Sequence, residues 1–487
     1  MELTTISEAF AQIDGFSLAP FDQILDEPIK QVLKEEGKDK YRAGTKLVPQ
    51  LLVWLVLALT LRRDLNCIKV LNWLVSGFRW MHNFIPAQSK LVQEGAISHA
   101  RVALGVNVFR QLFSKVTDSF QVPQPDFHGW VSVIFDGSTG TMPDTAANCE
   151  AFHKPASQRG SAAFPQLRMM TLLAVSMRVL LDIAYAPYSG KGTGERALVR
   201  ELLDRQAWRG LLFLLDAGLY ARDILWNIDQ QHNAFIVKAP RHVKFKPLES
   251  FDDGSFLARI SHKIPDLEAP LTKSGRQRWK KVFLTVRVIR LQIPGFRPVT
   301  LVTNLLDPAI TARDIAVHYH QRWDIEIAYD ELKTHQCATL RGQSPTTFRS
   351  KRPDLVKQEL YALLIMYNAV RWLIYQAAIQ HGKDPRAISF LDALQHIIDA
   401  APIMTAATRQ QQRDKFTYLL ALIADCDIDR PRRHRINARV VKVKISKFKR
   451  KTKEHKSEQR NIEQELKILS NQDYISLSFS RETVQVT

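Results

Sequence analysis

The sequence predicts a mixed α/β fold in which a central sheet domain is flanked by helical regions. Between about residues 126 and 350, short apolar runs rich in β-branched side chains alternate with segments of helical character. Runs of this kind are typical of strands that are covered on both faces by helices. On either side of this stretch, the apolar residues follow the helical period instead.

Length and charge narrow the class of protein. The chain has 487 residues, which suggests about three domains, and its 45% hydrophobic content supplies a sizeable core. Its net charge of +19 favours a polyanionic partner such as nucleic acid. A basic but indifferent surface, or attraction to anionic lipid, would leave the same charge.

Cellular location is inferred from the chain's start and its cysteines. Residues 1–16 carry three acids and no long apolar run, so we read no export signal there. The four cysteines are scattered without a zinc-ligand spacing. We therefore expect a cytoplasmic protein, nucleoid-associated when bound to DNA. The apolar stretch 360–379 is interrupted by Asn368 and Arg371 and is predicted to be a buried helix rather than a membrane span.

Residues 1–125 read as a helical N-terminal domain, which ends at a proline-rich linker. A DNA-binding module and a helical packing domain would look the same here. The domain at 126–350 follows, and its short apolar runs and helical segments give the expected order of elements. Strands are expected at 131–135, 167–177, 178–187, 211–215, 233–240 and 299–305, and helices at 192–206, 221–231 and 311–336.

Two further segments complete the chain. The polar stretch at about 240–296 reads as a β-rich insertion, with two strands around Val282–Leu291. Residues 351–430 form a helical C-terminal region, and residues 431–487 form a basic tail. Blocks of like charge are commonly solvated tails, and many of them bind nucleic acid.

The segment YHQRWDIEIAYDELK carries the first chemical signal. Its steps of three, four and seven residues place Tyr319, Arg322, Glu326 and Lys333 on one stripe of an α-helix. A carboxylate among phosphate-seeking donors suits a metal-dependent phosphodiester enzyme. Off this stripe, Trp323, Ile327 and Leu332 can face the core. The plain alternative is a surface helix with an i,i+4 ion pair worth about 0.3–0.5 kcal/mol.

Two aspartates give the second signal. Asp136 and Asp216 each close an apolar strand, and a glycine follows closely in both cases. Sites in α/β sheets gather at the carboxyl ends of strands. Either Asp-Gly alone would be read as an ordinary turn. Together with Glu326, the two acids form a set that can chelate a pair of hard cations.

The spacing Y-x2-R-x3-E-x6-K resembles the signature of the insertion-sequence-four family of bacterial DDE transposases. The segments 136–152 and 192–220 are similar to those around the family's first and second catalytic aspartates. The N-terminal LVPQLLVWLVLALTLRRD and the basic RINARVVKVKISKF also resemble family patterns, so the resemblance spans nearly the whole chain.

The resemblance implies a ribonuclease-H-like core with a β-strand insertion before the Glu-bearing helix. It also implies that Asp136, Asp216 and Glu326 are the catalytic metal ligands, for two Mg2+ ions that Mn2+ can replace. By the same resemblance, DNA near the cleaved end is held by three side chains, Tyr319, Arg322 and Lys333. A flipped base is expected to stack on an aromatic residue, and Trp279 and Phe296 are the two candidates.

The expected function is cut-and-paste transposition of double-stranded DNA by a homodimer on paired transposon ends, without a membrane or a nucleotide cofactor. The glycine-rich stretch at 189–195 lacks the residues of a phosphate loop. Within it, Glu195 is read as ordinary electrostatics in the first turn of a helix. Two alternatives stay open: a catalytically silent DNA-binding protein derived from a transposase, and a metal-dependent nuclease without strand transfer.

Overall fold

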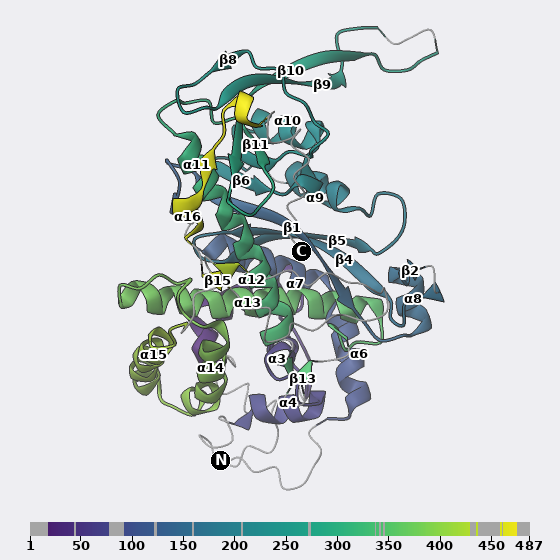
Figure 1. Cartoon of the computed structure of the whole chain (residues 1–487). Helices are drawn as coiled ribbons and strands as arrows, with labels where there is room; N and C mark the ends of the chain where they lie inside the picture. Colours follow the sequence, from purple (N-terminus) through teal and green to yellow (C-terminus); the bar gives the residue numbers. More distant parts are fainter. Residues whose placement is uncertain are drawn as a thin grey trace. The chain divides into compact units, whose positions relative to one another are not determined.

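The computed structural model describes most of the chain and divides it into two compact units (Figure 1). The described residues are 18–42, 45–76, 92–120, 124–157, 160–205, 208–270, 274–336, 338–339, 342–343, 346–428, 435–436, 458–459 and 461–474. Unit 1 comprises Met1–Gln124, Asp136–Leu198 and Asp324–Ile428, and unit 2 comprises Pro125–Phe135, Val199–Trp323 and Asp429–Thr487. Each unit is thus assembled from three separate stretches of sequence.

The core of unit 1 is helical. Helix α3 (Pro49–Leu61) is apolar on every side, and eleven of its thirteen residues are buried, as expected for a helix surrounded by others. It packs on α13 (Pro353–Gln380), which also contacts α7 (Asn107–Ser119). The remaining helices of this unit are η1 (Ala19–Phe21), α2 (Asp22–Glu35), α4 (Cys67–Leu74), α6 (Glu94–Leu104), α8 (Ala146–Phe152), α14 (Phe390–Thr405) and α15 (Arg409–Ala424).

Helix α13 is long and apolar enough to cross a membrane, yet 78% of its most apolar window is buried inside the protein. Both Asn368 and Arg371, which interrupt its apolar sequence, are fully buried. The Asn368 side chain bonds the backbone of Leu180, and the Arg371 guanidinium bonds Glu331. The prediction of a buried helix is therefore confirmed.

Unit 1 also holds a strand hairpin. Strand β4 (Gln166–Ala174) pairs with β5 (Val179–Pro187) in antiparallel register, as predicted, and Arg178 in the turn has φ 52°. Strand β4 lies beside β1 (Val131–Thr141) in the sheet. Late in β1, Gly140 packs under the buried Phe348 ring, which leaves no room for a side chain at that position.

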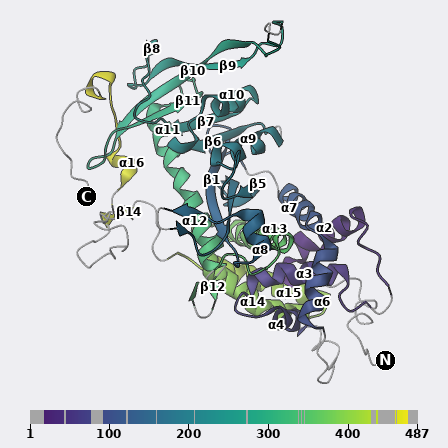
Figure 2. The same ribbon diagram turned by 90° about the vertical axis from the view of Figure 1, so that its right-hand side faces the viewer.

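Unit 2 is built on a sheet whose strand order continues from β1 through β6, β7, β11, β10, β9 and β8. Strands β1, β6 and β7 run parallel, and β11 pairs with β7 in the antiparallel sense. Helices α10 (Arg222–Gln230) and α11 (Ala312–Tyr319) lie on opposite faces of this sheet (Figure 2). The strand bounds are β6 Leu211–Leu215, β7 Ala234–Lys238, β8 Glu249–Ser250, β9 Phe256–Pro265, β10 Trp279–Gln292 and β11 Val299–Thr303.

The order β5-β4-β1 in unit 1 and β1-β6-β7 in unit 2 describes a ribonuclease-H-like core, an antiparallel hairpin followed by parallel strands. Between β7 and α11 the chain inserts β8–β11, as the sequence predicts. The two strands expected around Val282–Leu291 are a single long strand, β10, and its partner is β9. The polar sequence of β9 hid this strand because alternate residues of it point to solvent.

Part of the predicted basic tail belongs to the unit 2 sheet. Helix α16 (Ile462–Glu465) precedes β16 (Lys467–Ile468), which pairs with β10. The side chains of Leu466 and Leu469 are buried there, and Arg313 bonds the carbonyl oxygen of Leu466 at 3.1 Å. The basic run at 432–456, apart from Arg435–Ile436, lies outside the described residues.

Candidate active site

Asp136 lies inside a strand rather than at its end, which corrects the prediction. Strand β1 continues to Thr141, and Gly137 makes no turn because its φ is outside the left-handed region. Asp136 is half-buried, and one of its carboxylate oxygens accepts the Gly137 N–H at 2.9 Å. An Asp-Gly pair was a turn signal in the sequence, but the paired strands extend past it.

Asp216 directly follows β6, as predicted. It is the N-cap of the short 3-10 helix η2 (Ala217–Leu219), and its side chain accepts the Leu219 N–H at 3.0 Å. A Cβ atom at Gly218 would lie 3.2 Å from an Asp216 oxygen, so the glycine keeps this side of the carboxylate open. Ile134 pairs with Leu214 in the parallel register, so both aspartates come two residues after the same strand pair.

The segment predicted as one α-helix is helical but changes its geometry twice. Helix α11 begins at a capping box of Thr311 and Asp314, and the 3-10 helix η3 (His320–Trp323) follows it. The chain returns to an α-helix in α12 (Asp324–Asp330) and then forms a π-helix, η4 (Glu331–His335). Both changes shift the angular step per residue, so the four side chains do not form the regular α-helical stripe that their spacing predicted.

The residues flanking that stripe fare differently. Leu332 is buried as predicted, and Ile327 is half-buried. Trp323 was predicted to face the core, but it is 52% exposed. It is the last residue of the 3-10 turn, which rotates it away from the direction an α-helix would give. The Arg322 guanidinium lies over its ring, 4.5 Å from the centroid.

In unit 2, Tyr319 and Arg322 lie in the electrostatic surroundings of Asp216. The Tyr319 hydroxyl donates to the carbonyl oxygen of Leu215 at 2.9 Å, so it braces the backbone that immediately precedes Asp216. Burial raises the pKa of Tyr319, and the nearby Asp216 charge adds to the rise while Arg322 opposes it. Tyr319 is therefore a neutral phenol at physiological pH. The Nε of Arg322 is buried and has no hydrogen-bond partner among the described residues.

Sequence reasoning passed over one cation of this group, Lys238. It is the exposed last residue of β7. Desolvation lowers its pKa, and the positive charges of Arg322 and Arg241 lower it further, while Asp216 opposes this effect. Three cations and one carboxylate thus share the carboxyl end of β7. A signal was available, because Lys238 ends a buried strand just as Asp216 follows one.

In unit 1, the Glu326 helix is tied to β1 near Asp136. Glu326 itself is exposed. One turn further on, the Tyr329 hydroxyl donates to the carbonyl oxygen of Asp136 at 2.6 Å. The Lys333 ammonium donates to the carbonyl oxygen of Thr139 at 2.7 Å. These two bonds fix α12 and the π-helix along the stretch of β1 that contains Asp136.

Buried ion pairs also hold the Glu326 helix from the other side. Asp324, two residues before Glu326, accepts a hydrogen bond from Arg178 at 2.7 Å. Glu331, five residues after it, pairs with Arg371 of α13. All four of these charged side chains are at most 5% exposed. Buried pairs of this kind are costly to break, so they restrict where Glu326 can point.

The predicted metal ligands suit divalent cations by their chemistry. Carboxylate oxygens are the ligands that Mg2+ prefers, and it takes few of them because water and phosphate oxygens complete its octahedron. Asp136 and Asp216 are half-buried and Glu326 is exposed, so solvent and substrate oxygens can share their cations. Within the described residues, no three His, Cys, Asp or Glu side chains already form a closed metal site. An open site that phosphate oxygens complete agrees with both observations.

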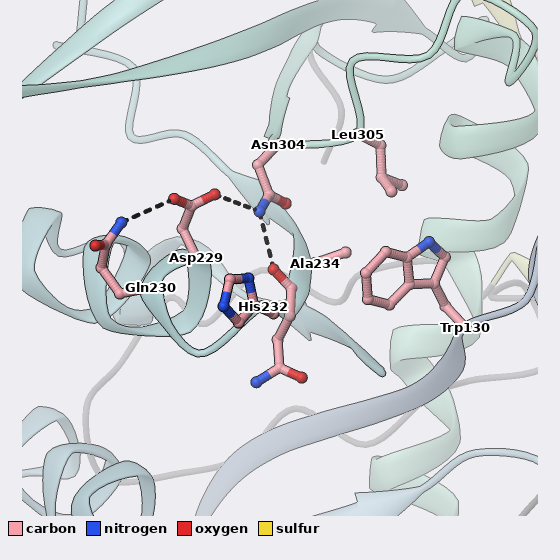
Figure 3. A pocket seen from close by; sticks show the side chains of 8 residues that line it. Trp130, Asp229, Gln230, His232, Ala234, Asn304 and Leu305 are labelled. Atoms are coloured by element: carbon pink, nitrogen blue, oxygen red, sulfur yellow. Dashed lines mark hydrogen bonds between the residues drawn. The ribbon is translucent and has the colours of Figure 1, made fainter. Parts of the chain in front are cut away.

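A separate pocket of about 410 Å3 lies at the other ends of the unit 2 strands (Figure 3). Trp130, just before β1, and Ala234, the first residue of β7, are among the residues lining it. Its polar groups bond one another: the Asn304 amide donates to Asp229 and to the carbonyl oxygen of Asn233, both at 2.9 Å. The pocket is therefore part of the scaffold, and none of the predicted site residues lines it.

The fold and the three acids define the class: a ribonuclease-H-like enzyme that acts on phosphodiesters with divalent metal ions. Known proteins match this description. Residues 17–114 match the family described as insertion element 4 transposase N-terminal, and residues 131–369 match the transposase DDE domain. The chain is 25% identical over 380 residues to transposase InsG for insertion sequence element IS4 of Escherichia coli K12, covering 76% of this chain and 80% of that protein.

The chain belongs to the IS4 family of DDE transposases. It is accordingly a DNA transposase, a metal-dependent endonuclease and strand transferase, and the silent DNA-binding alternative is not favoured. Among solved structures, the chain is similar to the cryo-EM structure of the piggyBac transposase synaptic complex with hairpin DNA. That likeness has a TM-score of 0.40 and 8% identity, with 86% of this chain and 85% of the other covered, and it is too distant to support an argument.

Proposed function

We propose that this transposase cuts both ends of its element and joins them to target DNA, with Asp136, Asp216 and Glu326 holding two Mg2+ ions. The observation that carries the assignment is the register of β1 and β6, which puts both aspartates two residues beyond the same strand pair. The buried ion pairs around Asp324 and Glu331 support Glu326 as the third ligand, since they fix the helix that bears it.

Bound divalent ions supply Lewis-acid stabilisation of the attacking and leaving oxygens in an in-line displacement. In the first step, water attacks a phosphodiester at the element's end, and the P–O bond breaks to leave a 3′-hydroxyl and a 5′-phosphate. In the second step, that 3′-hydroxyl attacks a target phosphodiester, and a target 3′-hydroxyl leaves. The number of phosphodiester bonds is conserved in this second step, so no nucleotide cofactor and no covalent protein–DNA bond are needed.

The DNA near the cleaved end would be held by the cations around the acids. Arg322 is proposed to contact phosphate through its buried, unpartnered Nε. Lys238 joins it because two neighbouring arginines already depress its pKa, and a phosphate dianion would relieve that repulsion. Lys333 is proposed to reach phosphate beside its bond to Thr139. Tyr319 is proposed to contact DNA too, but its hydroxyl can donate to phosphate only if it leaves the Leu215 carbonyl.

For the flipped base, both candidate aromatic residues are available on the insertion. Trp279 is 61% exposed and Phe296 is 39% exposed. Stacking of a base on an exposed ring contributes about 1–3 kcal/mol. We therefore expect Trp279→Ala or Phe296→Ala to lower the fluorescence change of 2-aminopurine placed at the element's end. The variant that leaves this signal unchanged identifies the residue that does not stack.

Further assignments concern the whole assembly. We propose that residues 1–125 take part in end recognition, that two copies bridge paired ends, and that the enzyme works in the cytoplasm on the nucleoid. The charge of +19 supports a DNA-bound state. Light scattering of the protein with and without end DNA measures the number of copies.

The decisive test is a Mg2+-dependent cleavage assay on supercoiled DNA carrying the gene's own flanking ends. Wild type should cut at the ends, and Asp136→Ala and Glu326→Gln should not, while end binding by Asp136→Ala stays nearly intact. Pre-cut ends with free 3′-hydroxyls should be joined to a target plasmid by wild type. Cutting without joining would leave a nuclease, and tight binding without cutting by any version would contradict the proposal.

A further inference from the structure

Glu195, the first residue of α9 (Glu195–Arg205), lies directly against the backbone next to Asp136. A Cβ atom at Gly137 would meet one Glu195 carboxylate oxygen at 2.8 Å, the carboxylate carbon at 2.9 Å and Cγ at 3.0 Å. The backbone of Gly137 does not itself require glycine, because its φ is outside the left-handed region. What requires glycine at this position is the room that the Glu195 side chain occupies.

A second contact shows that the two carboxylates share one neighbourhood. The Tyr329 hydroxyl donates to the carbonyl oxygen of Asp136 at 2.6 Å. Burial raises the pKa of this phenol most, and the negative charges of Asp136 and of Glu195 each raise it further. Both acids are therefore close enough to act on the same buried group, which stands on the helix that carries Glu326.

Electrostatics in the first turn of a helix does not explain this placement. An acid in the first turn gains about 0.3–1 kcal/mol from the helix dipole wherever its side chain points. Glu195 instead turns toward another acid, and like charges at short range repel. Among the described residues, no cation forms an ion pair with Glu195. A cation brought in from solution would remove the repulsion.

We propose that Glu195 is a fourth carboxylate of the catalytic metal site and a ligand on the Asp136 side, and that Gly137 is the opening that admits it. The proposal rests on the proposed roles of Asp136 and Glu326 as metal ligands. All the contacts that carry it lie in unit 1. The ligand is a hard divalent cation, Mg2+ or Mn2+, because the donors are carboxylate oxygens.

The test measures Mn2+ binding to the full chain without DNA, by the electron paramagnetic resonance signal of free Mn2+. Glu195→Gln should weaken binding about 10- to 100-fold, the range seen when a supporting ligand group is removed. The matched control is Glu201→Gln on the same helix, an exposed acid that pairs with Arg205, and it should bind like wild type. Equal affinity of the two variants would overturn the proposal.

Gly137→Ala provides an independent second variant. Its Cβ would push the flexible end of Glu195 away, so it should reproduce the Glu195→Gln defect, and the double variant should be no worse than Glu195→Gln alone. Additive defects would mean that the two residues act separately, which contradicts the proposal. Asp136→Ala separates the two levels of inference. If it loses Mn2+ and cleavage while Glu195→Gln matches wild type, only the fourth ligand fails; if Asp136→Ala still cleaves, the proposed function fails.

Discussion

The buried charges around the Glu326 helix lead to a quantitative prediction for Glu331→Gln. This change removes the negative charge facing Arg371, which is fully buried, and Arg178, which is 5% exposed. Arg178 keeps Asp324 as a partner at 2.7 Å, but Arg371 keeps no carboxylate. Removing one partner of a buried pair costs about 3–5 kcal/mol, because the other charge is left uncompensated.

Urea unfolding followed by circular dichroism measures the loss, and hydrogen exchange of α12 and α13 locates it. Glu201→Gln removes an exposed partner of Arg205 and should cost at most about 0.5 kcal/mol. Glu331→Leu combined with Arg371→Leu removes both charges and should recover most of the stability that Glu331→Gln loses. A loss below about 1 kcal/mol for Glu331→Gln, or a double variant less stable than the single one, would refute the reasoning.

Three other predictions concern single features. Lys238→Ala should weaken end binding and reduce the slope of log K against log salt by about one, whereas Lys246→Ala, an exposed lysine nearby, serves as the comparison; equal slopes would remove Lys238 from the DNA-binding group. Neutralising the basic run at 432–456 should flatten that slope without unfolding β16, and an unchanged slope would give the run another role. Gly140→Ala should destabilise by about 1–3 kcal/mol, since its Cβ would meet an aromatic ring at 2.4 Å, while Gly95→Ala, with open space around it, should be neutral or stabilising in thermal unfolding.

The sequence predicts the core strands well because each is a short apolar run that ends at a polar residue or a glycine. It predicts β9 poorly because that strand alternates between core and solvent and reads as polar. The docking of β16 on β10 was also missed. A two-residue strand inside a charged segment has no periodicity to detect, so only the pairing partner reveals it.

The site is predicted by residue type more accurately than by geometry. The three acids were identified from their positions, but the sequence could not show that β1 runs through Asp136, because pairing with neighbouring strands decides where a strand ends. The 3-10 and π turns around Glu326 were also hidden, since residue spacing assumes one helical period. Lys238 was overlooked because only acids were considered at strand ends.

The two ends of the unit 2 strands show how charge separates scaffold from site. At the amino ends, Asn304 satisfies Asp229 and the neighbouring backbone, so these polar groups are already stabilised within the protein. At the carboxyl ends, Lys238 and Arg322 repel one another beside Asp216, so this end is strained electrostatically in the free protein. An arrangement that is unfavourable alone becomes favourable when a phosphate and a divalent cation arrive together. The stability withheld from this end is therefore available as binding energy for the DNA that the enzyme cuts.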